Sequence, residues 1–350
     1  MRVVVRVDAW PSIGIGHLMR CLALAGLLRR NGAHVTFISR VVNGHLCDAI
    51  LDHGFEAIRL PPRFEAVEDF WQADAAQSLR AIGSLGAQVD LLVVDHYLLG
   101  LGWERALRAR VGRVLVIDDL ANRPHDCDLL LDQNLHSDSD VHYRALVPPG
   151  ARIFVGPQYA LLREEFAGIV AQPREKGVRR LLAYFGGGDG PSENIKVVRA
   201  LRQLGERAPE ATVVLGTESS HLEADIRNEA PSLRGVEILA ETRDMAKLML
   251  SADLALGTCG SAAWERCVTG LPTLAVITAS NQQDDARILH QRGAIRNLGE
   301  ARKSTVDLWV QEIRRLQDDA AALSLMSRAA ISVMQGRGEA AREFEAALGI

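Results

Sequence analysis

Two nearly continuous apolar segments constrain the fold of this chain more than any other feature. They span residues 2–8, where valine dominates, and residues 89–95, where valine and leucine dominate. A strand without a polar face has to be covered on both sides, as in a parallel sheet between two layers of helices. Segments with helical spacing follow several of the apolar strands, as residues 21–30 follow the first one. This alternation predicts an α/β fold class with doubly wound parallel sheets.

The length of the chain, 350 residues, predicts more than one domain, because single hydrophobic cores stop growing at about 250–300 residues. A polar, proline-bearing segment lies near residues 166–177, between two halves that each alternate strand and helix. We expect a Rossmann-like domain at residues 1–166, a second at residues 177–325 and a helical tail at residues 326–350. The carboxyl ends of the strands in the two domains are expected to face a common cleft.

Composition and charge exclude several classes of function. The net charge is −4 and the basic residues are dispersed, so nucleic acid and anionic membranes are not expected partners. No window approaches the roughly 18 uncharged apolar residues of a bilayer span, and the strand-like N-terminus does not fit a signal peptide. The five cysteines include no C-x-x-C pair, which is typical of a reducing compartment and argues against structural zinc. We expect a cytoplasmic protein, with no obligatory protein partner evident.

A glycine turn joins the first strand to the first helix. Its sequence, Ser-Ile-Gly-Ile-Gly-His-Leu-Met-Arg at residues 12–20, indicates a helix start whose backbone N–H groups point at an anion. His17 lies there, where an imidazole can face the ligand. The turn lacks the third glycine of the dinucleotide fingerprint, and the second strand ends at Ser39 and Arg40 with no acid for a ribose, which argues against NAD. The alternative is a turn that only connects strand and helix, with His17 in solvent.

Two further small-residue turns, at residues 186–190 and 257–261, follow predicted strands of the second half and can present N–H groups to phosphate. No G-K-[ST] sequence occurs, so a P-loop ATP site is not expected. Glu265 can hold ribose hydroxyls or lie exposed on its helix. Asn281 and Gln282 can cap the next helix or bind a sugar or phosphate. Nucleotide turns in the second domain and a histidine on the glycine turn of the first are typical of the GT-B arrangement of nucleotide-sugar enzymes.

Acidic and histidine side chains follow two neighbouring strands of the first half. Asp95 and His96 follow one strand, Asp118 and Asp119 follow the next, and His125 comes shortly after. Because open α/β sheets bind ligands at the carboxyl ends of their strands, these groups can form the site of a metal-dependent phosphohydrolase. The alternative for Asp95 and Asp118 is that each caps a helix or fixes a loop.

The motifs together closely resemble those of the UDP-sugar hydrolases of the pseudaminic acid pathway, which are relatives of the GT-B transferase that makes lipid II. The resemblance extends from about residue 6 to residue 295, and its motifs lie at residues 6–8, 13–22, 94–97, 117–134, 156–163, 185–189, 260–266 and 281–282. It implies hydrolysis of UDP-2,4-diacetamido-2,4,6-trideoxy-β-L-altropyranose in nonulosonic acid biosynthesis. Water would attack the anomeric carbon with inversion, without a metal or cofactor.

The resemblance also assigns residues to the site. By position it makes His17 the catalytic base, because a neutral imidazole can take a proton from water. It implies His17 and Tyr97 as catalytic residues, with a UDP-amino sugar as the partner. The predicted substrate-binding residues are Asp8, Gly14, Gly16, Arg20, Arg163, Gly187, Gly188, Gly260, Ser261, Glu265, Asn281 and Gln282.

Two positions depart from the usual pattern of that family. Cys259 stands where a second glycine is usual, and Ala263 where a hydroxyl residue is usual. Both belong to the expected phosphate loop, so UDP could bind more weakly or in a shifted pose, or the substrate could differ. Two other interpretations stay open: a GT-B glycosyltransferase or hydrolase acting on a related UDP-amino sugar, and a non-catalytic UDP-sugar-binding protein.

Overall fold

The computed structural model describes residues 1–8, 15–42, 44–62, 70–136, 141–186, 190–216, 220–229 and 233–350. Its internal contacts divide the chain into two units. Unit 1 consists of Met1–Glu164 together with Gly336–Ile350, and unit 2 consists of Glu165–Gln335. Within the described ranges, none of the helices combines the length and the apolar character needed to cross a membrane.

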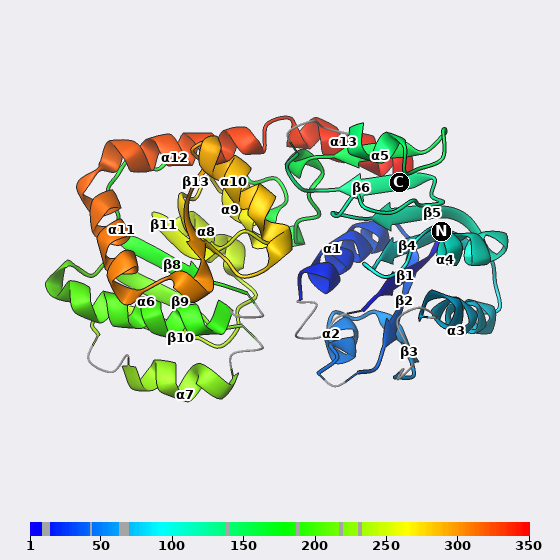
Figure 1. Ribbon diagram of the computed structural model, residues 1–350, viewed down its shortest axis with the longest axis horizontal. Helices are drawn as coiled ribbons and strands as arrows, with labels where there is room; N and C mark the ends of the chain where they lie inside the picture. Colours follow the sequence, from blue (N-terminus) through cyan, green and yellow to red (C-terminus); the bar gives the residue numbers. More distant parts are fainter. Residues whose placement is uncertain are drawn as a thin grey trace. The chain divides into compact units, whose positions relative to one another are not determined.

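Unit 1 is built on a seven-stranded sheet with the order β3-β2-β1-β4-β5-β6-β7, all of whose pairs are parallel (Figure 1). The strands are β1 (Arg2–Val7), β2 (His34–Arg40), β3 (Glu56–Leu60), β4 (Val89–Asp95), β5 (Val111–Ile117), β6 (Leu129–Asp132) and β7 (Arg152–Val155). The helices are α1 (Gly16–Arg30), α2 (Cys47–Asp52), α3 (Phe70–Ser84), α4 (Leu101–Leu107), α5 (Val141–Arg144) and α13 (Arg337–Leu348). The strand order reverses between β1 and β4, and such switch points are where open α/β sheets bind ligands.

The pleat of β4 determines which face each residue at its end meets. Val93 packs in the core cluster that contains α1 and α13, and Val94 packs in the opposite cluster, with α3 and α4. Side chains alternate between the faces along a strand. Asp95 therefore follows Val93 toward α1, and His96, just beyond the strand, meets Phe70 of α3, whose ring stacks on it at 5.5 Å.

Unit 2 has a six-stranded sheet with the order β10-β9-β8-β11-β12-β13, again with parallel pairs. The strands are β8 (Arg180–Tyr184), β9 (Glu210–Val214), β10 (Val236–Leu239), β11 (Leu254–Thr258), β12 (Thr273–Ile277) and β13 (Ile295–Glu300). The helices are α6 (Gly190–Leu204), α7 (Ser220–Glu229), α8 (Met245–Ser251), α9 (Ala262–Val268), α10 (Gln283–Gln291), α11 (Val306–Asp318) and α12 (Ala320–Val333). Its switch point lies between β8 and β11.

The prediction of two doubly wound parallel sheets is confirmed, but the predicted tail at residues 326–350 is not a separate element. Ser327 of α12 donates to the carbonyl of Gly270 in unit 2. Phe344 of α13 packs edge-on against Phe154 in unit 1, with 5.1 Å between ring centroids. The helical region before α13 divides into α11 and α12 at Asp319, whose carboxylate caps α12. Strand β13 was not expected.

Candidate functional site

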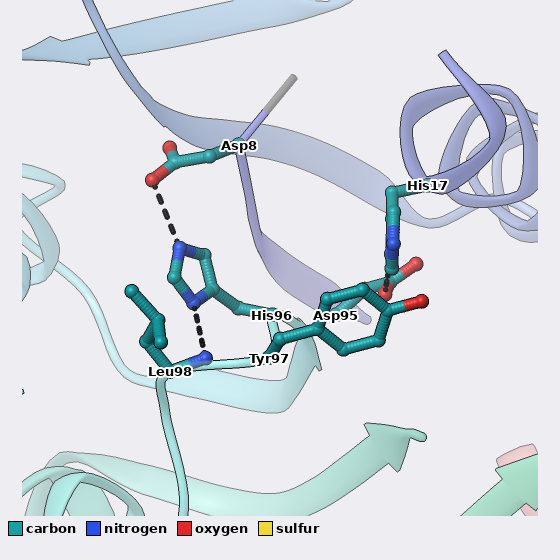
Figure 2. Close-up of a pocket in the computed structure, with 6 residues that line it drawn as sticks. All are labelled: Asp8, His17, Asp95, His96, Tyr97 and Leu98. Carbon is teal, nitrogen blue, oxygen red and sulfur yellow. Dashed lines mark hydrogen bonds and ion pairs between the residues drawn. The ribbon is translucent and has the colours of Figure 1, made fainter. Parts of the chain in front are cut away.

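His17 lies in the first turn of α1, and its imidazole reaches the end of β4 (Figure 2). Its Nδ1 is 2.5 Å from Oδ1 of Asp95. One turn along the helix, Arg20 holds the same carboxylate through Nε and Nη2, each at 2.6 Å. His17, Arg20 and Asp95 are 7%, 4% and 1% exposed. Helix α1 and strand β4 thus form a buried unit of one imidazole, one guanidinium and one carboxylate.

The ionisation of Asp95 determines which nitrogen of His17 carries the proton. Burial alone would raise the pKa of Asp95, but the charge of Arg20, with a smaller effect from His17, holds that pKa well below its ordinary value. An ionised carboxylate only accepts hydrogen bonds, so the 2.5 Å contact requires a proton on Nδ1 of His17. In the neutral imidazole the lone pair is then on Nε2, which has no hydrogen-bond partner among the described residues.

Tyr97 packs against His17 and fixes its orientation. The two rings meet edge to face, with centroids 4.6 Å apart. The Tyr97 hydroxyl donates to Oδ2 of Asp119 at 3.2 Å, and Nη1 of Arg20 donates to the same oxygen at 3.2 Å. Burial and the neighbouring Asp119 raise the pKa of Tyr97 above its ordinary value, so the phenol stays protonated at neutral pH. Tyr97 can therefore position the base, but it is not itself a base.

On the other face of the sheet, His96 and Asp8 form a second pair. Nε2 of His96 lies 3.2 Å from Oδ2 of Asp8, and the backbone N–H of Leu98 donates to Nδ1 of His96 at 3.1 Å. Because Nδ1 accepts a proton donor, His96 is neutral with its proton on Nε2. Burial lowers the pKa of His96 below its ordinary value, although Asp8 partly offsets this. Both ring nitrogens of His96 are therefore engaged.

Asp8 is held by arginine side chains and by the backbone. Nη1 of Arg6 donates to Oδ1 at 2.5 Å, Nη2 donates to Oδ2 at 2.8 Å, and the N–H of Arg40 donates to Oδ1 at 2.7 Å. Each carboxylate oxygen of Asp8 thus accepts two hydrogen bonds, counting the one from His96. Asp8 lines the same cavity as His17, but its charge is already neutralised.

The residues suggested for a metal-dependent phosphohydrolase are held by protein partners. His125 contacts Oε1 of Glu104 through Nδ1 at 2.7 Å. Asp118 accepts from the N–H groups of Leu120 and Ala121, so the prediction that it fixes a loop is confirmed. The loop-capping alternative for Asp95 is wrong, because this carboxylate holds side chains of α1. Among the described residues, no group of three or more His, Cys, Asp and Glu is arranged to hold a metal ion.

Several predicted residues of unit 2 gather at the carboxyl ends of its central strands. Gly260 and Ser261 connect β11 to α9, and Glu265 is buried on α9. Gln282, which follows β12, accepts from the N–H of Thr278 at 3.1 Å. A Cβ on Gly260 would lie 3.6 Å from Nε2 of Gln282, so the turns after β11 and β12 are in contact.

The remaining predicted residues are dispersed or lie outside the described ranges. Gly16 is the first residue of α1, Arg163 is half-buried in unit 1, and Asn281 is exposed in a 3-10 turn, Ser280–Gln282. The structure does not describe Gly14, Gly187 and Gly188, so their predicted contacts stay predictions.

The side chains at the two positions that depart from the family pattern are buried in unit 2. Cys259 and Ala263 are each 2% exposed. Burial raises the pKa of Cys259 to about 12, so its thiol stays protonated at neutral pH. Neither side chain is placed on the solvent side of the turn after β11.

Arg266 is a charged residue of this region to which the sequence assigned no role, although it lies in the motif at residues 260–266. It is 3% exposed and has no ion pair among the described residues. Its Nη2 donates to the carbonyl of Thr258, and its Nε has no hydrogen-bond partner in the described part of the chain. A Cβ on Gly257 would lie 2.8 Å from Nη1, so glycine makes room for the guanidinium. That none of the described acids pairs with Arg266 could not be detected from the sequence.

This chain is similar to known proteins in sequence and in fold. The chain is 25% identical over 298 residues to UDP-2,4-diacetamido-2,4,6-trideoxy-β-L-altropyranose hydrolase of Campylobacter jejuni, covering 84% of this chain and 97% of that protein. It is also 25% identical over 304 residues to the spore coat polysaccharide biosynthesis protein SpsG of Bacillus subtilis, covering 85% and 84% of the two chains. This chain is a relative of the UDP-sugar hydrolases. No model of a known protein family matches it.

Solved structures with the same architecture include glycosyltransferases. MurG of Acinetobacter baumannii superposes with a TM-score of 0.66 at 15% identity, over 100% of this chain and 99% of that one. Spinosyn rhamnosyltransferase SpnG superposes with a TM-score of 0.64 at 17% identity, over 100% of both chains. At these identities the likeness establishes the fold, which is GT-B.

Proposed function

We propose that this relative of the UDP-sugar hydrolases hydrolyses UDP-2,4-diacetamido-2,4,6-trideoxy-β-L-altropyranose to UDP and the free sugar, a step of pseudaminic acid biosynthesis. The observation that carries the proposal is the contact between His17 and Asp95. A buried, ionised carboxylate takes the proton of Nδ1 and leaves Nε2 of His17 with a lone pair. This arrangement is that of an oriented general base.

In the proposed reaction, Nε2 of His17 removes a proton from a water molecule as the water oxygen attacks the anomeric carbon. The bond between that carbon and the β-phosphate oxygen breaks, and its electron pair leaves with UDP. Attack on the side opposite the leaving group inverts the anomeric centre. Asp95 stabilises the imidazolium formed in this step, because its charge is held 2.5 Å from Nδ1. Arg20 and Tyr97 keep the carboxylate and the imidazole in place.

We assign UDP to unit 2. Gly260 and Ser261 would offer backbone N–H groups to the diphosphate, and Glu265 would accept from ribose hydroxyls. The buried charge of Arg266 supports an anion at this end of the sheet, since an unpaired buried cation is stabilised by an anionic ligand. Asp8, Gly14, Gly16, Arg163, Gly187, Gly188, Asn281 and Gln282 keep the substrate-binding roles that the resemblance gives them.

The test is a product analysis with the purified chain, the UDP-sugar and no acceptor, in buffer with and without a chelator. We expect UDP and free sugar in equal amounts under both conditions. His17→Asn should lose most of the turnover, by about 10²–10⁴-fold, and still bind UDP. UDP release that needs an added acceptor would identify a glycosyltransferase instead. UDP-sugar binding without UDP release would identify a binding protein.

A further inference from the structure

The cavity beside His17 in unit 1 is small. It has a volume of about 20 Å³ and is lined by Asp8, His17, Asp95, His96, Tyr97 and Leu98. Figure 2 shows Leu98 and His96 on one side of this group and His17 with Tyr97 on the other. A cavity measured in this way needs about 10–15 Å³ to hold one water molecule. The space is therefore large enough for one water molecule.

The carboxylates and ring nitrogens around the cavity leave one acceptor for such a water. The oxygens of Asp8 and Asp95 accept from arginine and histidine side chains, and both ring nitrogens of His96 are engaged. The remaining nitrogen is Nε2 of His17, which has no partner among the described residues. A water in the cavity would therefore direct an O–H at Nε2 and turn its lone pairs away from the base.

Leu98 is the most exposed residue of the cavity wall. It is 51% exposed, whereas Asp8, Asp95 and His96 are no more than 4% exposed. Its side chain contributes volume to the wall and no polar contact, so shortening it enlarges the cavity and leaves the base and its partners unchanged. The loss of stability should be small, because a half-exposed leucine buries only part of its surface.

We propose that this cavity binds the attacking water. Leu98 makes the enzyme a hydrolase by excluding alcohols from the position next to His17. The inference rests on the proposed function and extends it to the selection of the nucleophile. A GT-B transferase has to bring an acceptor hydroxyl, together with the carbon that bears it, to its base. That carbon needs room beyond the space of one water, and Leu98 is the aliphatic side chain of the lining. Leu98 is thus a specificity-determining residue that takes no part in proton transfer.

The experiment is competition between water and methanol. The chain is incubated with the UDP-sugar in aqueous methanol, and the free sugar and the methyl glycoside are quantified by mass spectrometry. The wild type should form free sugar only. Leu98→Ala should form methyl glycoside in a share that rises with the methanol concentration. Leu98→Met, which conserves volume, and Leu51→Ala, a truncation of an exposed leucine that does not line the cavity, should behave as the wild type.

Two results would overturn the inference while leaving hydrolysis established: methyl glycoside from the wild type in the same share as from Leu98→Ala, or none from Leu98→Ala. Failure of the proposed function has a different signature, because the wild type would then release no UDP in buffer without an acceptor.

Discussion

Buried arginines have different partners in the two units. In unit 1, Arg6 binds Asp8 and Asp74, and Arg20 binds Asp95 through two nitrogens, so each guanidinium is neutralised by carboxylates. In unit 2, Arg266 is equally buried and has a backbone carbonyl as its hydrogen-bond partner among the described residues. Burial lowers the pKa of Arg266 below its ordinary value. A buried cation without an ion pair is costly, and an anionic ligand would offset that cost.

Arg6 and Arg20 of unit 1 keep acids ionised, and one of those acids orients His17. In the proposed function, Arg266 of unit 2 instead meets a ligand of opposite charge.

The largest effect is expected from Asp95→Asn. The amide cannot stabilise an imidazolium, and its NH₂ group has to face a donor of either Arg20 or His17. We expect kcat to fall by up to about 10⁴-fold, equivalent to about 5.5 kcal/mol in the barrier, while the Kd for UDP stays within a few-fold. Steady-state kinetics and UDP titration measure the two quantities. A kcat within threefold of the wild type would remove Asp95 from the mechanism.

Arg6→Met should destabilise unit 1. It leaves the carboxylates of Asp8 and Asp74 buried without this partner, which costs about 3–5 kcal/mol for a broken buried ion pair. The loss should appear as faster amide hydrogen exchange in β1 and β4. Arg59→Met, which removes an exposed ion pair, serves as the control and should change little. Equal protection in the two variants would contradict the account of Asp8.

The same substitution in unit 2 should have the opposite effect on stability. Arg266→Met removes an unpaired buried charge, so the melting temperature should stay the same or rise. UDP should bind about 10–100-fold more weakly, because a hydrogen bond to a charged group contributes about 1.5–3 kcal/mol. Isothermal titration with UDP gives the Kd, with exposed Arg292→Met as control. Unchanged UDP affinity in Arg266→Met would show that this cation has a structural role alone.

The smallest effect is expected on the stability of unit 1 as the pH falls. Burial lowers the pKa of His96, so the stability from its neutral form is complete above the unfolded pKa of about 6.5 and is lost as the pH falls through the folded value. Asp74, whose pKa is lowered to about 2 because Arg6 outweighs the opposing effect of burial, adds a loss between about pH 4 and pH 2. Both lie in unit 1. Hydrogen exchange corrected for intrinsic rates should therefore show β1 and β4 opening before β11 and β12 on acidification, and the reverse order would contradict this.

Sequence patterns predicted the elements better than the contacts between them. Apolar strands such as β4 and the helix that begins at Gly16 are local signals, and they lie where predicted. The pairing of His17 with Asp95 joins residues 78 positions apart and depends on strand order and pleat, which a single sequence does not specify. Strand β13 was missed because Arg296, Asn297 and Gly299 interrupt its apolar pattern. Helical spacing gave no indication that α13 packs in unit 1.

The central claim is that water, activated by His17, attacks carbon and not phosphorus. Hydrolysis in ¹⁸O-labelled water tests it directly, with the label located by mass spectrometry of both products and measured before the free sugar exchanges its anomeric oxygen. The account predicts the label in the sugar and none in UDP, at a rate that falls with His17→Asn. Label in the terminal phosphate of UDP would mean attack at phosphorus and would contradict the mechanism.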